Sequence, residues 1–293
     1  MIDEFALLPE NAADAGVVLP SIPPVRRVST LSDSGQTVSA LLWGDTSPEV
    51  VVLHGGHQNA HTWDSMLLAL GVPALAVDLP GHGHSEWRVD RDYTPRMLAE
   101  QVVPVLRQWA PDAAAVIGAS LGGLTTIRLT AVAPDLVRCA VIVDVTPSVH
   151  LRRLTMSRAD RGTTALADAP RSFATFEEVV ELAAAAAPRR AWSAVRRGVV
   201  HNTRQRRDGS WEWRYDSLRG GDFSDLWEDV GAARVPLTLV RGGASAFVSD
   251  ADADTFVQRC AWAQVHVVPG AGHSVQSDAP LELAALIRAA LNS

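Results

Sequence analysis

Lysine is absent from this sequence, and all 26 basic residues are arginine. Together with the abundance of alanine, valine and aspartate, this absence is typical of coding in a GC-rich genome, so it concerns the genome rather than the chemistry. Net positive charge is absent as well: the 33 acidic residues outnumber the basic ones and leave a net charge of −7. With no long basic run, such a chain is not expected to have nucleic acid or an anionic membrane as its partner.

Cysteine is also rare. The two cysteines, Cys139 and Cys260, each lie within an apolar segment, which favours buried free thiols over a disulfide or a metal-binding pair. Free thiols are typical of a reducing compartment, so we expect a cytoplasmic protein. The residues from Met1 to Phe5 begin neither a basic region nor a long apolar core, so no signal peptide is expected. Apolar runs also stay well short of the ~20 residues that a membrane-spanning helix needs.

Apolar residues are plentiful: they make up 47% of the 293 residues, which can fill a sizeable core in one large domain or two small ones. Short all-apolar runs bounded by glycine predict buried parallel strands. Their alternation with helical stretches predicts a mostly parallel, doubly wound α/β sheet. Strands are expected at 25–31 and 37–43 (an antiparallel pair), 50–53, 74–77, 113–119, 140–144, 236–240 and 265–268, and helices at 59–70, 95–109, 250–259 and 281–291.

Residues outside this alternation fall into two segments. Residues 1–24 are proline-rich and weakly patterned, which indicates an arm on the surface. Between 146 and 233 the strands disappear, and helical stretches near 177–187 and 189–200 precede an aromatic cluster at 211–215. We expect this insertion to be a mostly helical cap, with 1–145 and 234–293 forming the core. Cap residues Trp192, Trp211 and Trp213 are candidates to line or brace a pocket.

The motif Gly118-Ala119-Ser120-Leu121-Gly122 follows a predicted strand and opens a predicted helix. A serine on so sharp a turn has a strained backbone, and the residues two before and two after it must be nearly free of side chain to avoid a clash. Its hydroxyl then projects above the edge of the sheet. The first turn of the following helix offers unpaired N–H groups that suit an anion. This context favours a nucleophile elbow over a chance match or a dinucleotide-binding loop.

Other candidate residues fall at the ends of the predicted strands. Gly56, Ser120, Asp144 and His273 each follow a different strand. Ligands of open parallel sheets bind outside the carboxyl ends of the strands, so these four residues are expected to converge. A serine needs a base to remove its proton and a third group to orient that base. His273, in a loop rich in glycine, is the best candidate for the base.

At this point the chain resembles the α/β-hydrolase superfamily over nearly its whole length. The matching pieces are His54-Gly55-Gly56, 78–85, the elbow at 118–122, and Gly270-Ala271-Gly272-His273-Ser274. The resemblance implies the α/β-hydrolase fold and the order serine, acid, histidine. It also implies that the backbone N–H groups of Leu121 and Gly56 form the oxyanion hole.

The acid departs from the common pattern of this superfamily. Many relatives carry it shortly after the seventh strand, yet the stretch 241–247 contains no carboxylate. Asp144 ends an apolar strand next to the strand that bears Ser120. A minority of relatives carry the catalytic acid at this position. Asp250 is the alternative, although an acid at the start of a helix has a simpler role in capping. We therefore predict the set Ser120, His273 and Asp144.

The remaining histidines are not expected to bind metal. His54, His57, His82 and His84 lie in glycine-rich loops without a nearby set of carboxylates or cysteines, so hydrogen bonding within the loops is favoured. The sequence predicts no cofactor, and the expected partner is a small-molecule substrate. It does not indicate an oligomeric state.

The leading functional prediction is a serine hydrolase that cleaves an ester, a thioester or a vinylogous carbon–carbon bond. A serine nucleophile disfavours epoxide hydrolases and haloalkane dehalogenases, which use aspartate on this fold. Two alternatives stay open. One is a cofactor-free dioxygenase of the same fold, some members of which place the acid after the sixth strand. The other is a non-catalytic relative that keeps the fold for binding a ligand.

Overall fold

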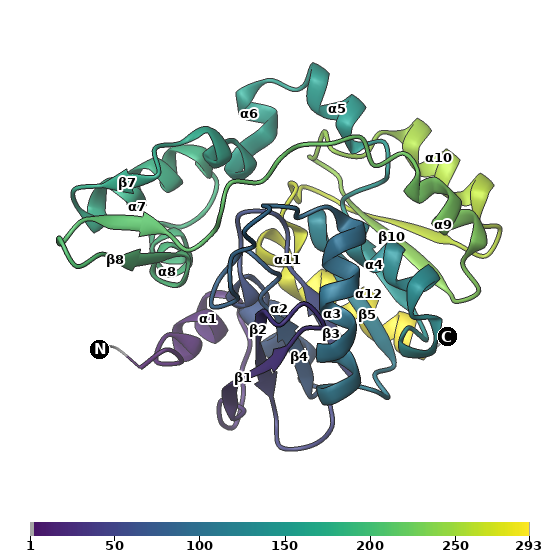
Figure 1. Ribbon diagram of the computed structural model, residues 1–293, viewed down its shortest axis with the longest axis horizontal. Helices are drawn as coiled ribbons and strands as arrows, with labels where there is room; N and C mark the ends of the chain where they lie inside the picture. The colour runs from purple at the N-terminus through teal and green to yellow at the C-terminus, as the bar shows by residue number, and fades with distance from the viewer. Residues whose placement is uncertain (1–2, 293) are drawn as a thin grey trace.

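An eight-stranded sheet runs through the computed structural model, which describes residues 3–292 (Figure 1). The strand order is β1-β2-β4-β3-β5-β6-β10-β11. β2 is antiparallel to β1 and β4, and every other pair in this sheet is parallel. The strands are β1 (Val25–Leu31), β2 (Thr37–Trp43), β3 (Val50–Leu53), β4 (Ala74–Val77), β5 (Ala115–Ala119), β6 (Ala140–Val143), β10 (Leu237–Gly242) and β11 (Gln264–Val268).

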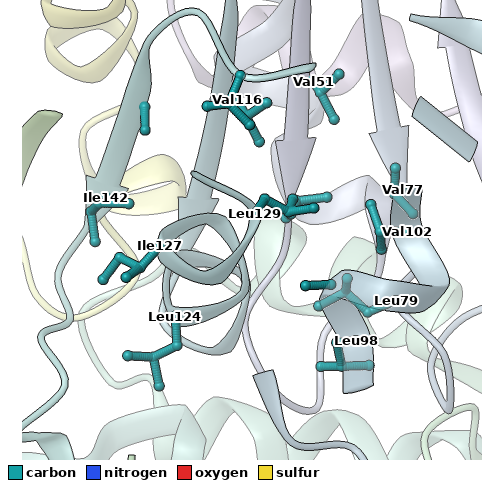
Figure 2. Packing of buried hydrophobic residues seen from close by; sticks show 14 of the residues in the cluster. Val51, Val77, Leu79, Leu98, Val102, Val116, Leu124, Ile127, Leu129 and Ile142 are labelled. Atoms are coloured by element: carbon teal, nitrogen blue, oxygen red, sulfur yellow. The ribbon is translucent and has the colours of Figure 1, made fainter. Parts of the chain in front are cut away.

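Helices cover both faces of this sheet, as its all-apolar strands require. Successive strand residues point to opposite faces, so Val51 joins one apolar cluster and Val52 the other. Figure 2 shows residues of the first cluster, with Val51 and Val116 on the strands and Leu124, Ile127 and Leu129 on the helix that covers them. The helices on that face are α3 (Pro95–Trp109), α4 (Leu121–Val132), α9 (Leu226–Ala232) and α10 (Asp250–Arg259), and those on the other are α1 (Leu8–Asp14), α2 (Asp64–Leu70), α11 (Val275–Asp278) and α12 (Pro280–Leu291).

Helix boundaries follow local capping signals. α3 begins after Thr94, whose hydroxyl accepts from the Met97 N–H, and has proline at its first position. α10 begins with a capping box between Ser249 and Asp252. Both helices match their expected bounds. The caps satisfy backbone N–H groups that the helix itself leaves unpaired, and so determine where each helix begins.

Two expected elements differ from the structure. The single helix expected at 59–70 is a 3-10 helix, η1 (Ala60–Trp63), followed by α2. The Asn59 side chain accepts from the His61 N–H, which caps the tighter first turn. The expected N-terminal arm contains α1, whose Leu8 is 2% exposed and packs into the core cluster beside α2. Its short apolar face was too brief to give a helical pattern in the sequence.

Residues 146–233 form a layer of their own for most of their length (Figure 1). Their apolar cluster includes Phe173, Val180, Val199, Trp213 and Tyr215. A three-stranded antiparallel sheet, β7-β9-β8, lies among the helices. The sequence did not predict these strands, because each spans only two or three residues. The elements are α5 (Val149–Thr155), α6 (Arg158–Arg161), η3 (Gly162–Asp168), β7 (Ser172–Phe173), α7 (Phe176–Ala186), α8 (Trp192–Asn202), β8 (Thr203–Gln205) and β9 (Trp211–Trp213).

The last helix of the expected cap packs elsewhere. In α9, Leu226, Trp227 and Val230 join the cluster on the main sheet, together with Phe256 of α10. α9 therefore lies with the core, although it falls inside the expected range 146–233. The change of pattern near 234 marked the next strand of the main sheet and not the end of the separate layer.

The sequence predicted buried free cysteines and no membrane-spanning helix. Cys139 and Cys260 are both free and buried, which confirms that expectation. Among residues 3–292, none of the helices combines the length and apolarity required for crossing a membrane.

A partly buried ionic network ties the N-terminal residues to the core. His61 Nδ1 donates to Asp64 Oδ2 at 2.9 Å, and His61 Nε2 donates to Glu4 Oε1 at 3.1 Å. Arg27 also binds Glu4 and donates to Asp78 Oδ2 at 2.7 Å. Burial acts to lower the pKa of His61, but the carboxylates of Asp64 and Glu4 outweigh it and raise the pKa to about 9.

His61 is therefore expected to make stability depend on pH. A raised folded-state pKa gives stabilisation that is complete below the unfolded value of ~6.5 and is lost as pH rises through about 9. His61→Gln should lower the free energy of unfolding by about 2–3 kcal/mol at pH 6 and have little effect at pH 10. Urea unfolding at several pH values measures this. His266→Gln, at a histidine without an ion pair among residues 3–292, is the control. A His61→Gln loss that is the same at both pH values would contradict the assignment.

Candidate active site

Ser120 lies on the turn between β5 and α4 with φ at +50°, a conformation that residues other than glycine rarely adopt. A Cβ on Gly118 would lie 2.2 Å from the Gly122 carbonyl oxygen, and one on Gly122 would lie 2.2 Å from the Leu53 oxygen. Neither position has room for a side chain. The strand, sharp turn and helix expected from the motif are all present.

The loop after β3 approaches this turn closely. A Cβ on Gly55 would lie 3.2 Å from Ser120 Cβ, and one on Gly56 would lie 3.9 Å from Leu121 Cδ2. The Gly122 N–H donates to the His54 carbonyl at 3.0 Å and joins the turn to the loop. Within residues 3–292, the N–H groups of Gly56 and Leu121 donate no hydrogen bond. Two N–H groups close to Ser120 are thus available to an anionic oxygen.

The loop histidines hold backbone in place. His54 is fully buried, its Nδ1 donates to the Gly55 carbonyl at 2.7 Å, and its Nε2 accepts from the Leu79 N–H at 2.9 Å. His82 Nδ1 donates to the Pro80 carbonyl at 3.0 Å. Burial lowers the pKa of both rings, and so favours their neutral forms. Hydrogen bonding within the loops is what the sequence predicted for these two residues.

Asp144 is fully buried at the end of β6, with φ at +52°. Its Oδ1 accepts from the Gly242 N–H at 2.9 Å, and its Oδ2 accepts from His273 Nδ1 at 2.8 Å and from the Ser245 hydroxyl. A buried carboxylate is costly without such partners. Three donors from β10, the loop after it and the loop after β11 therefore hold this carboxylate in one orientation.

The His273 ring is fixed on two sides. Besides its bond to Asp144, it stacks on Phe247 with ring centroids 3.5 Å apart and an interplanar angle of 16°. Its Nε2 is buried and has no hydrogen-bond partner within the described chain. With Nδ1 committed as a donor, Nε2 of the neutral ring is left with a free lone pair. That nitrogen can accept a proton.

Asp250 lies away from this arrangement. Its side chain is 94% exposed, and it pairs with Arg241 Nη1 at 2.8 Å in the first turn of α10. The structure thus brings Asp144, and not Asp250, to His273. Sequence reasoning missed Ser245 and Phe247, which occupy the stretch where many relatives carry the acid. The lack of a carboxylate there was the available signal, since some other residue had to support His273.

Ser120 and His273 line one pocket of about 710 Å³ between the sheet edge and the segment 146–233. Gly56 lines it as well. Of the three candidate tryptophans, Trp213 lines the pocket, Trp192 is 54% exposed, and Trp211 packs against Phe176. The wall formed by residues 183–202 combines short apolar side chains with polar ones. The apolar or small residues are Ala183, Ala187, Ala191, Ala194, Val195, Gly198 and Val199, and the polar ones are Arg189, Arg190, Arg197, His201 and Asn202.

One group of side chains in the described chain has the spacing of a metal site. His61, Asp64 and His201 bring a ligand atom each within 4.8 Å of one another, in the wall of the pocket. Both ring nitrogens of His61 already donate hydrogen bonds, and the raised pKa keeps that ring protonated near neutral pH. In this arrangement His61 has no lone pair for an ion. No sequence pattern indicates this group, because His201 comes from a helix far away in the chain.

The parallel sheet, the serine turn, and the histidine and carboxylate at the same edge together define the α/β-hydrolase class. The sequence model of the alpha/beta hydrolase family matches residues 50–286. Esterase Rv0045c of Mycobacterium tuberculosis is 51% identical over 294 residues, covering 100% of this chain and 97% of that protein. Esterase YbfF of Escherichia coli is 29% identical over 228 residues, covering 74% of this chain and 82% of its own.

Solved structures agree with these matches. The structure of the M. tuberculosis esterase Rv0045c aligns with a TM-score of 0.89 and 51% identity, covering 100% of this chain and 99% of that chain. E-2-(acetamidomethylene)succinate hydrolase, 23% identical with a TM-score of 0.75, covers 92% of this chain and 100% of its own and shares the fold. The chain belongs to the alpha/beta hydrolase family. The expected family, fold class and assignment as an α/β-hydrolase enzyme are confirmed.

Replacing Asp144 should disable the site, whereas replacing Asp250 should not. Asp144→Asn keeps the shape but no longer favours the His273 tautomer with hydrogen on Nδ1. We expect the rate at which a fluorophosphonate probe labels Ser120 to fall by about three to four orders of magnitude. Asp250→Asn, which removes an exposed partner of Arg241, should stay within about twofold of wild type. An inactive Asp250→Asn beside a nearly normal Asp144→Asn would reverse the assignment.

Proposed function

We propose that this protein is a serine esterase that works through Ser120, His273 and Asp144. The observation that carries the proposal is the fixed His273 ring, which donates to a buried carboxylate at 2.8 Å and presents an unpartnered Nε2 in the pocket lined by Ser120. The M. tuberculosis relative, 51% identical across the whole chain, is named an esterase. Its name supports a carboxylic ester as the bond that is cleaved, in preference to a thioester or a carbon–carbon bond.

In the proposed reaction, His273 Nε2 takes the Ser120 proton while the serine oxygen attacks the ester carbonyl carbon. The imidazolium that forms is stabilised by Asp144, which keeps its negative charge. The carbonyl oxygen becomes an oxyanion and is held by the free N–H groups of Leu121 and Gly56, each contributing about 3–4 kcal/mol. The same proton then passes from His273 to the leaving alcohol. Water, activated by His273, releases the acid from the acyl-enzyme.

One observation favours a second candidate. Asp144 follows β6, and some cofactor-free dioxygenases of this fold also place their acid after the sixth strand. In such an enzyme the histidine would deprotonate an aromatic substrate instead of the serine. Two relatives are named esterases, which favours hydrolysis over dioxygenase chemistry. The same names favour an enzyme over a protein that only binds a ligand. A small-molecule substrate and a cytoplasmic location stay predictions.

The proposed nucleophile is tested by ester hydrolysis. Wild-type protein should hydrolyse p-nitrophenyl acetate and butyrate, and a fluorophosphonate adduct should map to Ser120. Ser120→Ala and His273→Ala should each lower kcat by about 10³–10⁶-fold, because the base and the nucleophile act as one unit. Oxygen uptake with hydroxyquinolone-type compounds and no ester hydrolysis would instead identify the dioxygenase. An adduct on another residue would contradict the role of Ser120.

We further propose that residues 146–233, apart from α9, act as a cap that sets substrate preference. Ala194 of α8 lines the pocket, so Ala194→Phe should fill part of the space available to an acyl chain. We expect kcat/KM for longer p-nitrophenyl esters to fall about tenfold or more relative to the acetate, with fluorophosphonate labelling nearly unchanged. Trp192→Ala, at an exposed residue of the same helix, should preserve the ranking. Equal losses for all chain lengths would argue against a selective cap.

A further inference from the structure

The end of helix α8 touches the loop that carries Gly56. Asn202, the last residue of α8, donates from Nδ2 to the His57 carbonyl at 2.8 Å and accepts from Asn59 Nδ2 at 3.1 Å. A carbonyl can only accept, so the amide nitrogen of Asn202 must face His57. Both partners then receive the correct end of the side chain.

The residue held in this way has an unusual backbone. His57 directly follows Gly56 and has φ at +64°, the left-handed region that costs a residue with a side chain about 1 kcal/mol or more. Its ring packs edge-on against Tyr215, with centroids 4.8 Å apart. Such a conformation persists only where surrounding contacts determine it. Asn202 and Tyr215, both outside the main sheet, supply those contacts.

Asn202 is itself well anchored. Arg197, 6% exposed on the same helix, donates to Asn11 Oδ1 at 2.9 Å and pairs with Asp14, both in α1. The Asn202 carbonyl accepts from the Arg214 N–H at 2.8 Å. The helix is therefore fixed at its middle by α1 and at its end by the residue that follows β9. A side chain on such a support can hold a loop in one geometry.

We infer that Asn202 is a positioning residue for the oxyanion loop and that the cap helix thereby sets the donor geometry at Gly56. The inference rests on the proposed esterase function. Asn202 touches no reacting atom in this role: it holds the carbonyl of the peptide between residues 57 and 58, and so restrains the left-handed His57 backbone that directly follows Gly56. A misplacement of about 1 Å in such a donor can cost ~10²-fold in rate.

The test compares two variants of Asn202 with a control from the same helix. Asn202→Ala removes both hydrogen bonds, whereas Asn202→Asp keeps the acceptor for Asn59 and places a carboxylate oxygen against the His57 carbonyl. Each should lower kcat for p-nitrophenyl butyrate about 10- to 100-fold with KM within about threefold. Affinity for a trifluoromethyl ketone that mimics the tetrahedral intermediate should fall by the same factor as kcat/KM. Ser193→Ala, which loses a bond to Asp14 in α1, should change neither quantity more than about twofold.

The outcomes separate this inference from the function on which it rests. If wild-type protein hydrolyses no ester, the proposed function fails, and the rate of fluorophosphonate labelling of Ser120 replaces kcat as the readout for Asn202. A kcat within twofold of wild type in both Asn202 variants, or a loss confined to KM, would overturn the inference. A loss of inhibitor affinity shared by Ser193→Ala would overturn it too. Circular dichroism and melting temperature identify a variant that fails to fold, in which case the other Asn202 variant decides.

Discussion

The close approach of α4 to the end of β3 is the constraint on which the site depends. The Gly122 N–H reaches the His54 carbonyl at 3.0 Å, and a methyl group on Gly122 would collide with the Leu53 oxygen. This contact places the serine turn and the glycine loop side by side. Because the contact is between two backbones, it leaves the surrounding side chains free to vary with the substrate.

A second set of contacts gathers around Asp144. In many relatives the acid arises from the loop after the seventh strand, whereas in this chain that loop gives a hydroxyl and an aromatic ring. Ser245 donates to the Asp144 carboxylate, and Phe247 supports the plane of His273. The loop therefore still serves the histidine, although its carboxylate comes from the neighbouring strand.

Much of this arrangement was predictable from the sequence. All-apolar runs placed the parallel strands, and the ends of those strands indicated Gly56, Ser120, Asp144 and His273 as neighbours. The short strands around Trp211, the split helix after Asn59 and the helix α1 were missed, because two to seven residues carry too little periodicity to be recognised. Contacts between distant segments, such as Asn202 with His57 or His61 with Glu4, have no local signal at all. They depend on packing that only the complete fold defines.

The position of α1 has a consequence for exchanging specificity between members of this family. Asn11 and Asp14 of α1 line the pocket and bind Arg197 of α8, while Leu8 packs into the core. The wall of the pocket is thus built from two pieces of chain that are far apart in the sequence. A chimaera that received only the inserted segment from a relative would set a foreign helix against the original α1. Under the proposed role of the insertion in substrate preference, residues 8–14 would have to be exchanged together with it as one module.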